Sequence, residues 1–226
     1  MFGKLRTIRA ILTQYGLADS IWRLRYNWRK KRGDFAREYP AFPWRDKSLS
    51  DYFNADGPQS SGEIKDYLKS RAGTFIFAPG VFPQVPKHWR ENAVNRANAL
   101  VEHGEFEYFS CPDQRGGLGY PEVDWFKNPF TGQRDTQAVH WSLREDFDSD
   151  RGDIKFIWEP SRFAWAYDLV RAFAATGDDK YPEAFWTLLE SWLDANPPMI
   201  GPGWQCGQET AIKVMGVSFG LWAFLE

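Results

Sequence analysis

The sequence predicts a mostly α-helical protein built from antiparallel helical hairpins, with long irregular segments and at most short strands. Two observations lead to this fold class. First, three segments near the C-terminal end, 160–176, 182–195 and 205 onward, have apolar residues at helical spacing and short loops between them. Short loops between long helices make neighbouring helices antiparallel. Second, residues 105–155 are rich in Gly, Pro, Asp and Trp and show no helical period.

Residues 1–32 predict a basic helical arm. Residues 4–15 and 18–31 have apolar residues at helical spacing and are separated by Gly16, so we expect two helices there. Nine Lys and Arg residues stand against Asp19 alone, which gives this arm a charge of +8 and leaves −10 for the rest of the chain. Such an arm suits a peripheral membrane surface, an anionic polymer or a protein partner; the alternative is a solvated arm that binds nothing.

The following segments predict a linker and then the main domain. Residues 33–59 are rich in Pro, Asp and Ser and have scattered aromatic residues, which is typical of a connecting segment. We therefore divide the chain into an arm with its linker, 1–59, and a helical domain, 60–226. At the start of this domain we expect a short helix at 62–72 and a short extended piece at 74–77.

Residues 87–103 predict a longer helix, because Pro86 and Gly104 stand at its two ends. The irregular segment 105–155 comes next. A segment of this length without helical period in a compact domain is usually functional; alternatively, it carries short strands.

Turn residues mark the ends of the last three helices. We expect Pro160 to open the first helix, Gly177 to end it, and Pro182 to lie in the first turn of the second helix. Gly201 and Gly203 then lead into the third helix.

The composition is that of a globular protein with an unusual share of aromatic residues. Hydrophobic residues make up 43% and aromatic residues 17%, including twelve Trp. We expect roughly two thirds of the Trp rings in the core and the others open to stacking on sugars. A net charge of −2 gives the chain no general attraction for nucleic acid.

No segment of the sequence predicts a membrane span, and no signal peptide is visible. We therefore favour a cytoplasmic protein, or a periplasmic one if a leader has been removed. Cys111 and Cys206 are too few for a disulfide framework, so we expect free thiols, with a single pair as the alternative. The three His residues are dispersed, and we expect neither a metal site nor a cofactor.

A series of short motifs follows the chain from residue 99 to residue 209. The motifs are Ala99-Leu100, His103-Gly104-Glu105-Phe106, Val123-Asp124-Trp125, Gly152-Asp153-Ile154-Lys155, Trp158-Glu159, Ser161-Arg162-Phe163, Thr176-Gly177-Asp178-Asp179, Ser191-Trp192-Leu193, Asn196-Pro197-Pro198, Gly201, Gly203-Trp204 and Gly207-Gln208-Glu209. No single motif is specific, but their order and spacing are, and in this order they resemble the heparinase II/III-like polysaccharide lyases. The resemblance covers residues 85–226 well and residues 1–84 only loosely.

This resemblance implies that residues 60–226 form the N-terminal part of an incomplete (α/α) toroid, which is followed in the family by β-sandwich domains. Members of the family cleave uronic-acid polysaccharides by β-elimination. Such an enzyme neutralises the carboxylate next to C5 so that the developing enolate is tolerated. A Tyr, with a His in some members, moves the proton between C5 and the leaving oxygen.

The resemblance also implies two gaps in the catalytic machinery. The residue that neutralises the carboxylate commonly precedes the Trp that corresponds to Trp204, and here that position is Gly203. The catalytic Tyr of the family corresponds to a position after Glu226. We therefore expect a substrate-binding portion of a lyase, inactive alone and truncated as a toroid. The alternative is a non-catalytic module that binds glycans or is associated with polysaccharide biosynthesis.

Eight residues near these motifs are candidate substrate-binding groups for an acidic polysaccharide or oligosaccharide, and no catalytic residue is assigned. Arg162 has a planar fork that suits a uronate carboxylate, or it pairs with Glu159 one helical turn away. Glu209 contacts the substrate, or it accepts hydrogen bonds at the start of its helix. For the others the alternatives are a buried ring, a solvated amide or a structural His. The eight are Glu159, Arg162, Trp204, Gln205, Gln208, Glu209, His140 and Trp141.

Overall fold

The structure is a computed structural model that confirms a mostly helical fold with one two-stranded sheet in its described part. It describes residues 2–48, 51–53, 56–71, 77, 81–82, 84, 86–136, 138–145 and 151–225, with the backbone alone for residues 2–12. Most of the predicted extended piece at 74–77 lies outside these residues. No helix among the described residues is long and apolar enough to cross a membrane.

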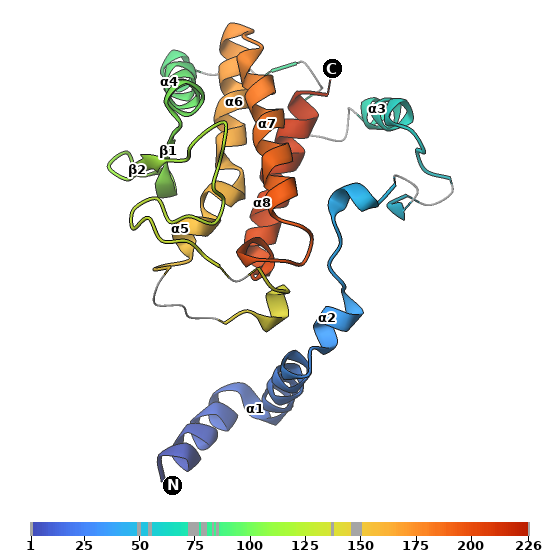
Figure 1. The fold of residues 1–226 in the computed structure, drawn as a ribbon, viewed down its shortest axis with the longest axis vertical. Coiled ribbons are helices and arrows are strands. Elements are labelled where there is room, and N and C mark those ends of the chain that lie inside the picture. Colours follow the sequence, from blue (N-terminus) through green and yellow to red (C-terminus); the bar gives the residue numbers. More distant parts are fainter. Residues whose placement is uncertain are drawn as a thin grey trace.

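The body of the molecule is a layer of long helices around α6 (Ala164–Thr176). α4 (Lys87–His103), α7 (Lys180–Ala195) and α8 (Gly207–Ala223) all pack against it. Figure 1 shows α6, α7 and α8 running side by side, with α4 on the far side of α6. These helices form the toroid-like arrangement of helical hairpins that the sequence predicts.

The ends of these helices follow the predicted turn residues closely, with one correction. α4 has the predicted bounds, and Gly104 ends it in the left-handed conformation with a φ of 66°. The first of the last three helices does not begin at Pro160. Pro160 opens only a 3-10 turn, and Phe163, with a φ of 59°, interrupts the chain before α6 starts. Phe163 adopts this conformation because its ring is fully buried against Trp165 and Trp192.

The core is aromatic, and its helices approach closely at two glycines of α8. A Cβ atom added at Gly220 would lie 2.1 Å from Cε2 of Phe185, and one added at Gly216 would lie 2.9 Å from the carbonyl oxygen of Phe163. Four of the twelve Trp side chains are buried, four are partly buried and four are exposed. The buried indoles have hydrogen-bond acceptors, as at Trp192, whose Nε1 donates to Ser161 Oγ at 3.0 Å.

The irregular segment contains short strands, which was one of the two alternatives for it. β1 (Glu105–Glu107) pairs with β2 (Arg115–Gly117) in an antiparallel hairpin. α5 (Lys155–Trp158) follows, and 3-10 turns lie in the loops of the chain. These turns are Trp44–Asp46, Tyr108–Ser110, Trp141–Leu143, Pro160–Arg162 and Pro202–Trp204. Cys111 and Cys206 are free thiols, as expected.

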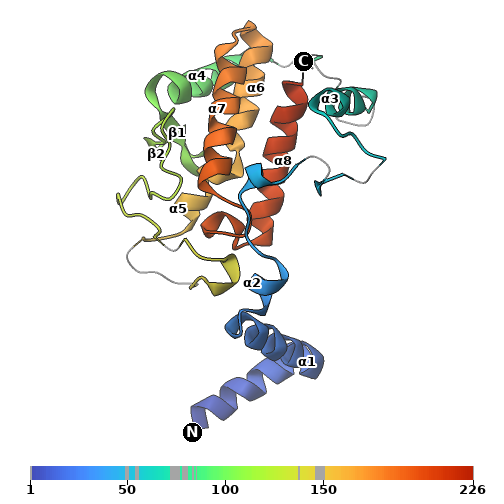
Figure 2. The same ribbon diagram turned by 45° about the vertical axis from the view of Figure 1, so that its right-hand side comes forward.

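The N-terminal arm extends away from the helical body, and the C-terminus lies at the opposite end of the molecule (Figures 1 and 2). α1 (Phe2–Lys31) is broken at Gly16, whose φ of 78° and ψ of 171° separate the two predicted helices. α2 (Asp34–Glu38) and α3 (Ser61–Ser70) follow. The linker contacts the body through Asp194 of α7, which accepts hydrogen bonds from Trp44 Nε1 at 2.9 Å and Arg45 Nε at 3.0 Å.

Candidate functional site

Three of the predicted site residues form an ion cluster between the 3-10 turn that precedes α6 and the start of α8. The Arg162 fork donates two hydrogen bonds of 2.7 Å to the carboxylate of Glu209 and a further one to Glu159. Both carboxylates are buried, and Glu159 also accepts a hydrogen bond from the backbone N–H of Phe109 at 3.0 Å. The predicted pair between Arg162 and Glu159 is therefore present, and the hydrogen bond to Glu209 raises the pKa of Arg162. We call these three residues the α8 anchor.

Gly203 and Lys213 contact each other close to Glu209 of the α8 anchor. Gly203 is buried, and an added Cβ would lie 3.2 Å from Asn196 Oδ1 and 3.2 Å from Trp192 Cζ2. Its carbonyl oxygen accepts a hydrogen bond of 2.7 Å from Lys213 Nζ, which lies 4.4 Å from the centre of the Trp192 ring. Burial lowers the pKa of Lys213 to about 8, and the nearby Glu209 opposes this shift. Glycine at 203 thus leaves room for a buried lysine.

The predicted residues of the turn before α8 are more open. Trp204 is partly buried, packs against Trp192 with the two rings tilted by 49°, and donates to the carbonyl oxygen of Asn196 at 3.3 Å. Gln205 accepts a hydrogen bond of 3.2 Å from Arg144 Nε, whereas its amide nitrogen has no protein acceptor among the described residues. Gln208 is exposed in the first turn of α8.

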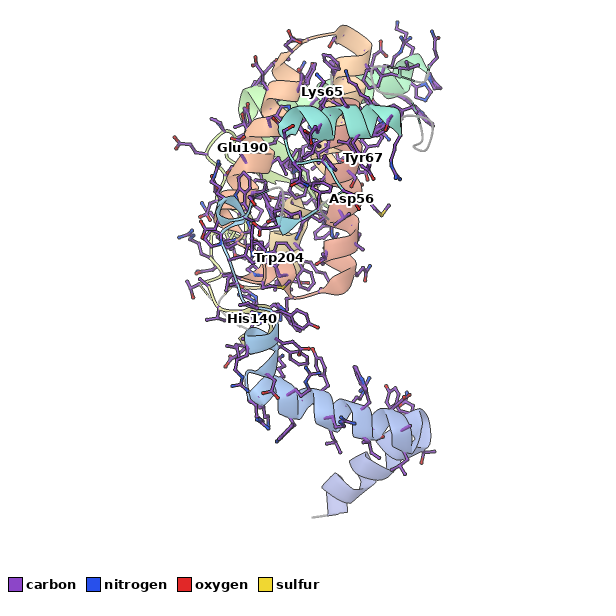
Figure 3. All side chains as sticks on the ribbon, turned by 90° about the vertical axis from the view of Figure 1, so that its right-hand side faces the viewer. Asp56, Lys65, Tyr67, His140, Glu190 and Trp204 are labelled. Carbon is purple, nitrogen blue, oxygen red and sulfur yellow. The ribbon has the colours of Figure 1, made fainter. Side chains whose placement is uncertain are left out.

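His140 and Trp141 lie inside the junction of the linker and the body. His140 is buried, and its two ring nitrogens contact Ser142 Oγ at 2.8 Å and the carbonyl oxygen of Tyr39 at 3.0 Å. Trp141 packs against Phe35 of α2, with the ring centres 5.6 Å apart. Figure 3 shows His140 below Trp204, at the end of the body that faces the N-terminal arm. In this conformation the pair ties the linker to the body.

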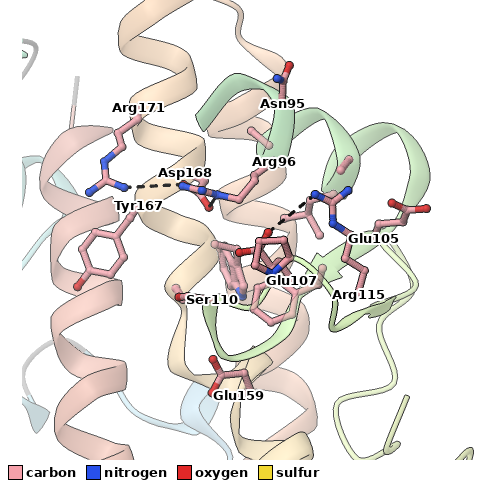
Figure 4. A pocket seen from close by; sticks show the side chains of 17 residues that line it. Asn95, Arg96, Glu105, Glu107, Ser110, Arg115, Glu159, Tyr167, Asp168 and Arg171 are labelled. Carbon is pink, nitrogen blue, oxygen red and sulfur yellow. Dashed lines mark hydrogen bonds and ion pairs between the residues drawn. The ribbon is translucent and has the colours of Figure 1, made fainter. Parts of the chain in front are cut away.

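A cavity of about 590 Å³ lies on the open face of α6, between α4 and the β1–β2 hairpin. We call it the α6 pocket. Figure 4 shows charged and aromatic side chains of its lining, with Arg171, Tyr167 and Asp168 on α6, Arg96 on α4 and Glu159 at one end. Glu159 is therefore shared by the pocket and the α8 anchor. Its lining also contains Phe106, Trp165, Ser110, Asn95, Glu105, Glu107 and Arg115.

The arginines of the α6 pocket differ in how closely they are paired with acidic side chains. Arg96 forms a bidentate pair with Asp168 at 2.8 and 2.6 Å, and this hydrogen bonding raises the pKa of Arg96. Arg171 lies 3.8 Å from the same carboxylate, and Arg115 lies 3.9 Å from Glu107. Both side chains are about half exposed. Because such long, exposed pairs are weak, these two guanidinium groups can exchange partners at little cost.

The described residues contain no group of three or more His, Cys, Asp or Glu side chains that could hold a metal ion. A second ionic cluster, in which Arg144 and Arg151 surround Asp135, is buried and supports the irregular segment. The α6 pocket offers a ligand guanidinium, carboxylate and aromatic groups.

Sequence reasoning missed two features of the site. Lys213 follows Glu209 by one helical turn in a helix that is mostly apolar beyond its first turn. This isolated charge is the signal in the sequence that could have identified Lys213. The α6 pocket has no local signal, because Arg96 and Asp168 come from helices that are 72 residues apart in the sequence.

The geometry defines a helical, toroid-like domain with a charged pocket on one helix face. The family model described as Heparinase II/III N-terminus matches residues 52–218, about three quarters of the chain. The chain belongs to this family, as the motifs indicate. No curated protein and no solved structure matches the chain significantly.

Proposed function

We propose that this chain is the N-terminal, substrate-binding portion of a polysaccharide lyase that acts on uronic-acid-containing glycans. The observation that carries the proposal is the α6 pocket in a heparinase II/III N-terminal domain, since it combines two weakly paired arginines with aromatic side chains. Its volume of about 590 Å³ lies in the usual range for small-ligand sites.

In this proposal Arg171 and Arg115 bind the uronate carboxylate, each exchanging a weak contact to an acidic side chain for the sugar carboxylate. Tyr167 offers its partly exposed ring to the C–H face of the sugar, whereas Phe106 and Trp165 are buried and form the apolar base of the pocket. The α8 anchor fixes the turn before α8 relative to the pocket. Trp204 and Gln205 next to α8, and Gln208 in its first turn, extend the binding surface beyond Glu159.

Cleavage by β-elimination further requires a group that neutralises the carboxylate and a base that removes the C5 proton. Gly203 has no side chain, and Asn196, Trp192 and Lys213 fill the space that one would need. Residues 1–226 alone are therefore proposed to bind without cleaving. The same observation favours a second candidate, a non-catalytic glycan-binding module associated with polysaccharide biosynthesis.

Calorimetric titration with tetrasaccharides of alginate, heparan, chondroitin and glucuronan tests the binding proposal. We expect one of them to bind, and Arg171→Ala to weaken it about tenfold or more because a charge-assisted hydrogen bond is lost. Arg134→Ala is the matched control, since Arg134 is equally exposed and also paired with an Asp, Asp124, outside the pocket. Equal affinities of the two variants, or no binding to any of the four, would contradict the proposal.

The ultraviolet absorbance of unsaturated chain ends separates the two candidate functions. Residues 1–226 should bind and give no signal. A longer protein that contains these residues should give the signal if it is a lyase, and should bind without a signal if it is a non-catalytic module.

A further inference from the structure

Four apolar side chains form a single exposed stripe on the second half of α1. Leu17, Ile21, Leu24 and Trp28 are separated by four, three and four residues, a spacing that places them on one face of a helix. All four are exposed, at 67%, 48%, 70% and 57%. Such a run of large apolar groups on one face marks an interaction surface.

The opposite side of α1 holds the arm to the body and directs the stripe away from it. Tyr26 packs against Phe35, and Phe35 packs against Trp141, with ring centres 5.2 and 5.6 Å apart. Both ribbon views show α1 beyond α2, extending away from the helices of the body (Figures 1 and 2). The stripe therefore stays exposed, although the guanidinium of Arg32 lies over the Trp28 ring, 4.3 Å from its centre.

Basic side chains flank the stripe on both sides. By helical spacing, Lys31 lies on one side of it and Arg25 and Arg32 lie on the other. All three are exposed, and no acidic residue of α1 flanks the stripe: Asp19, its sole acid, lies on the opposite face. The whole segment 1–32 carries a charge of +8. The partner of this surface is therefore apolar at its centre and anionic at its rim.

A membrane with anionic lipids has these properties, and the other partners do not. A hydrated acidic polymer would pair with the basic groups but would leave Leu17, Ile21 and Leu24 in water. A second copy of α1 would cover the stripe, but it would bring Arg25 and Arg32 against Ser and Asn or against each other. The acid beside Arg32 is Asp34 of its own chain, at 3.6 Å, and a second α1 would add none.

We infer that the second half of α1 is a docking helix for an anionic lipid surface. It lies flat in the interface, with Leu17, Ile21, Leu24 and Trp28 among the acyl chains and Arg25, Lys31 and Arg32 at the level of the phosphate groups. Trp28 is suited to this depth because its ring is apolar and its N–H is polar. The inference is independent of the glycan proposal, because it uses none of the residues of the α6 pocket.

Vesicle flotation of the full chain tests the inference. We expect binding to phosphatidylcholine vesicles with 30% phosphatidylglycerol and little binding to phosphatidylcholine alone. Leu24→Glu should weaken binding at least tenfold, since burial of a Leu side chain contributes on the order of 1.5–3 kcal/mol, a factor of about 10 to 150. Arg25→Gln with Lys31→Gln should weaken it about thirtyfold at low salt, from roughly fivefold for each charge.

Val214→Glu on α8 is the matched control, because it also replaces an exposed aliphatic residue of a helix by Glu. It should bind vesicles as the unaltered protein does. Failure of the unaltered protein to float with anionic vesicles, or equal losses for Leu24→Glu and Val214→Glu, would overturn the inference. So would a dimer in sedimentation analysis that Leu24→Glu dissociates, because the stripe would then be an interface between copies.

Discussion

Lys213 is a buried lysine whose ammonium group lies on an indole ring and donates to the carbonyl oxygen of Gly203. Burial lowers its pKa to about 8 in the folded protein, from 10.5 in the unfolded chain. Below about pH 8 the folded protein bears the full cost of the buried charge. Between about pH 8 and 10.5 the unfolded chain binds more protons, so the contribution of Lys213 to stability increases with pH in this window.

The increase of this contribution with pH gives a stability prediction for Lys213. Replacing it by Met removes the titrating group and keeps an unbranched apolar stem. Between pH 8 and 10 the free energy of unfolding of the unaltered protein should rise by about 2 kcal/mol relative to that of Lys213→Met. Urea denaturation at the two pH values measures the difference. Parallel pH profiles would show that the Lys213 pKa is not lowered.

Arg162 is the cation shared by two buried carboxylates, those of Glu159 and Glu209. Its removal deprives both carboxylates of the hydrogen bonds and the positive charge of Arg162. Arg162→Met should therefore lower the free energy of unfolding by about 3 kcal/mol or more. Arg171→Met, on the next helix but exposed and weakly paired, should change it by less than about 0.5 kcal/mol. Chemical denaturation of both variants measures the contrast. If they lose the same stability, the α8 anchor does not hold the turn before α6 to α8.

At the scale of elements, the sequence predicted the helices whose ends are chemically marked. Pro86 and Gly104 delimit α4, and Gly16 breaks α1, because proline and glycine restrict or extend the allowed backbone conformations locally. The start of α6 was missed by a few residues. The left-handed conformation of Phe163 comes from burial of its ring among distant residues, and no local pattern reports that.

The hairpin β1–β2 illustrates the same limit in strands. Each strand has three residues, which is too short for an alternating pattern to be recognised. The pairing of Phe106 with Gly116 is instead set by packing, because a Cβ at Gly116 would lie 3.1 Å from the ring of Tyr108.

The close approach of α8 to the turn before α6 gives a prediction at this scale. A Cβ at Gly216 would lie 2.9 Å from the carbonyl oxygen of Phe163 and 3.0 Å from that of Arg162, and backbone atoms cannot move aside easily. Gly216→Ala should therefore lower the free energy of unfolding by about 2 kcal/mol despite the better helix propensity of Ala. Gly207→Ala in the first turn of the same helix, with no atom within 4 Å of its added Cβ, should be close to neutral. Equal thermal midpoints of the two variants would contradict the close packing of Gly216 against the turn before α6.

At the scale of the whole molecule, the sequence predicted the family and part of the site. The pair of Arg162 with Glu159 was one of the two alternatives that the sequence offered, whereas the contact of Arg162 with Glu209, 47 residues further along, was not predicted. The α6 pocket could not be predicted, since its walls come from α4, α6 and the hairpin, whose side chains meet only in the folded chain. The division into an arm at 1–59 and a domain at 60–226 stays a prediction.

The molecule has two surfaces of different chemistry, a pocket on α6 and an apolar stripe on α1. If both proposals hold, the arm would keep a glycan-binding domain next to a membrane. The two activities should be separable, because Arg171→Ala should weaken glycan binding and leave vesicle binding unchanged, whereas Leu24→Glu should do the reverse.

The central claim is that the α6 pocket binds an acidic sugar, and a crystal structure of the chain with the tightest-binding uronate tetrasaccharide tests it most directly. We predict a uronate in the α6 pocket, with its carboxylate within hydrogen-bond distance of Arg171 or Arg115 and its ring against Tyr167. A tetrasaccharide bound at another surface, with the pocket occupied only by solvent and Arg171 still beside Asp168, would contradict the claim.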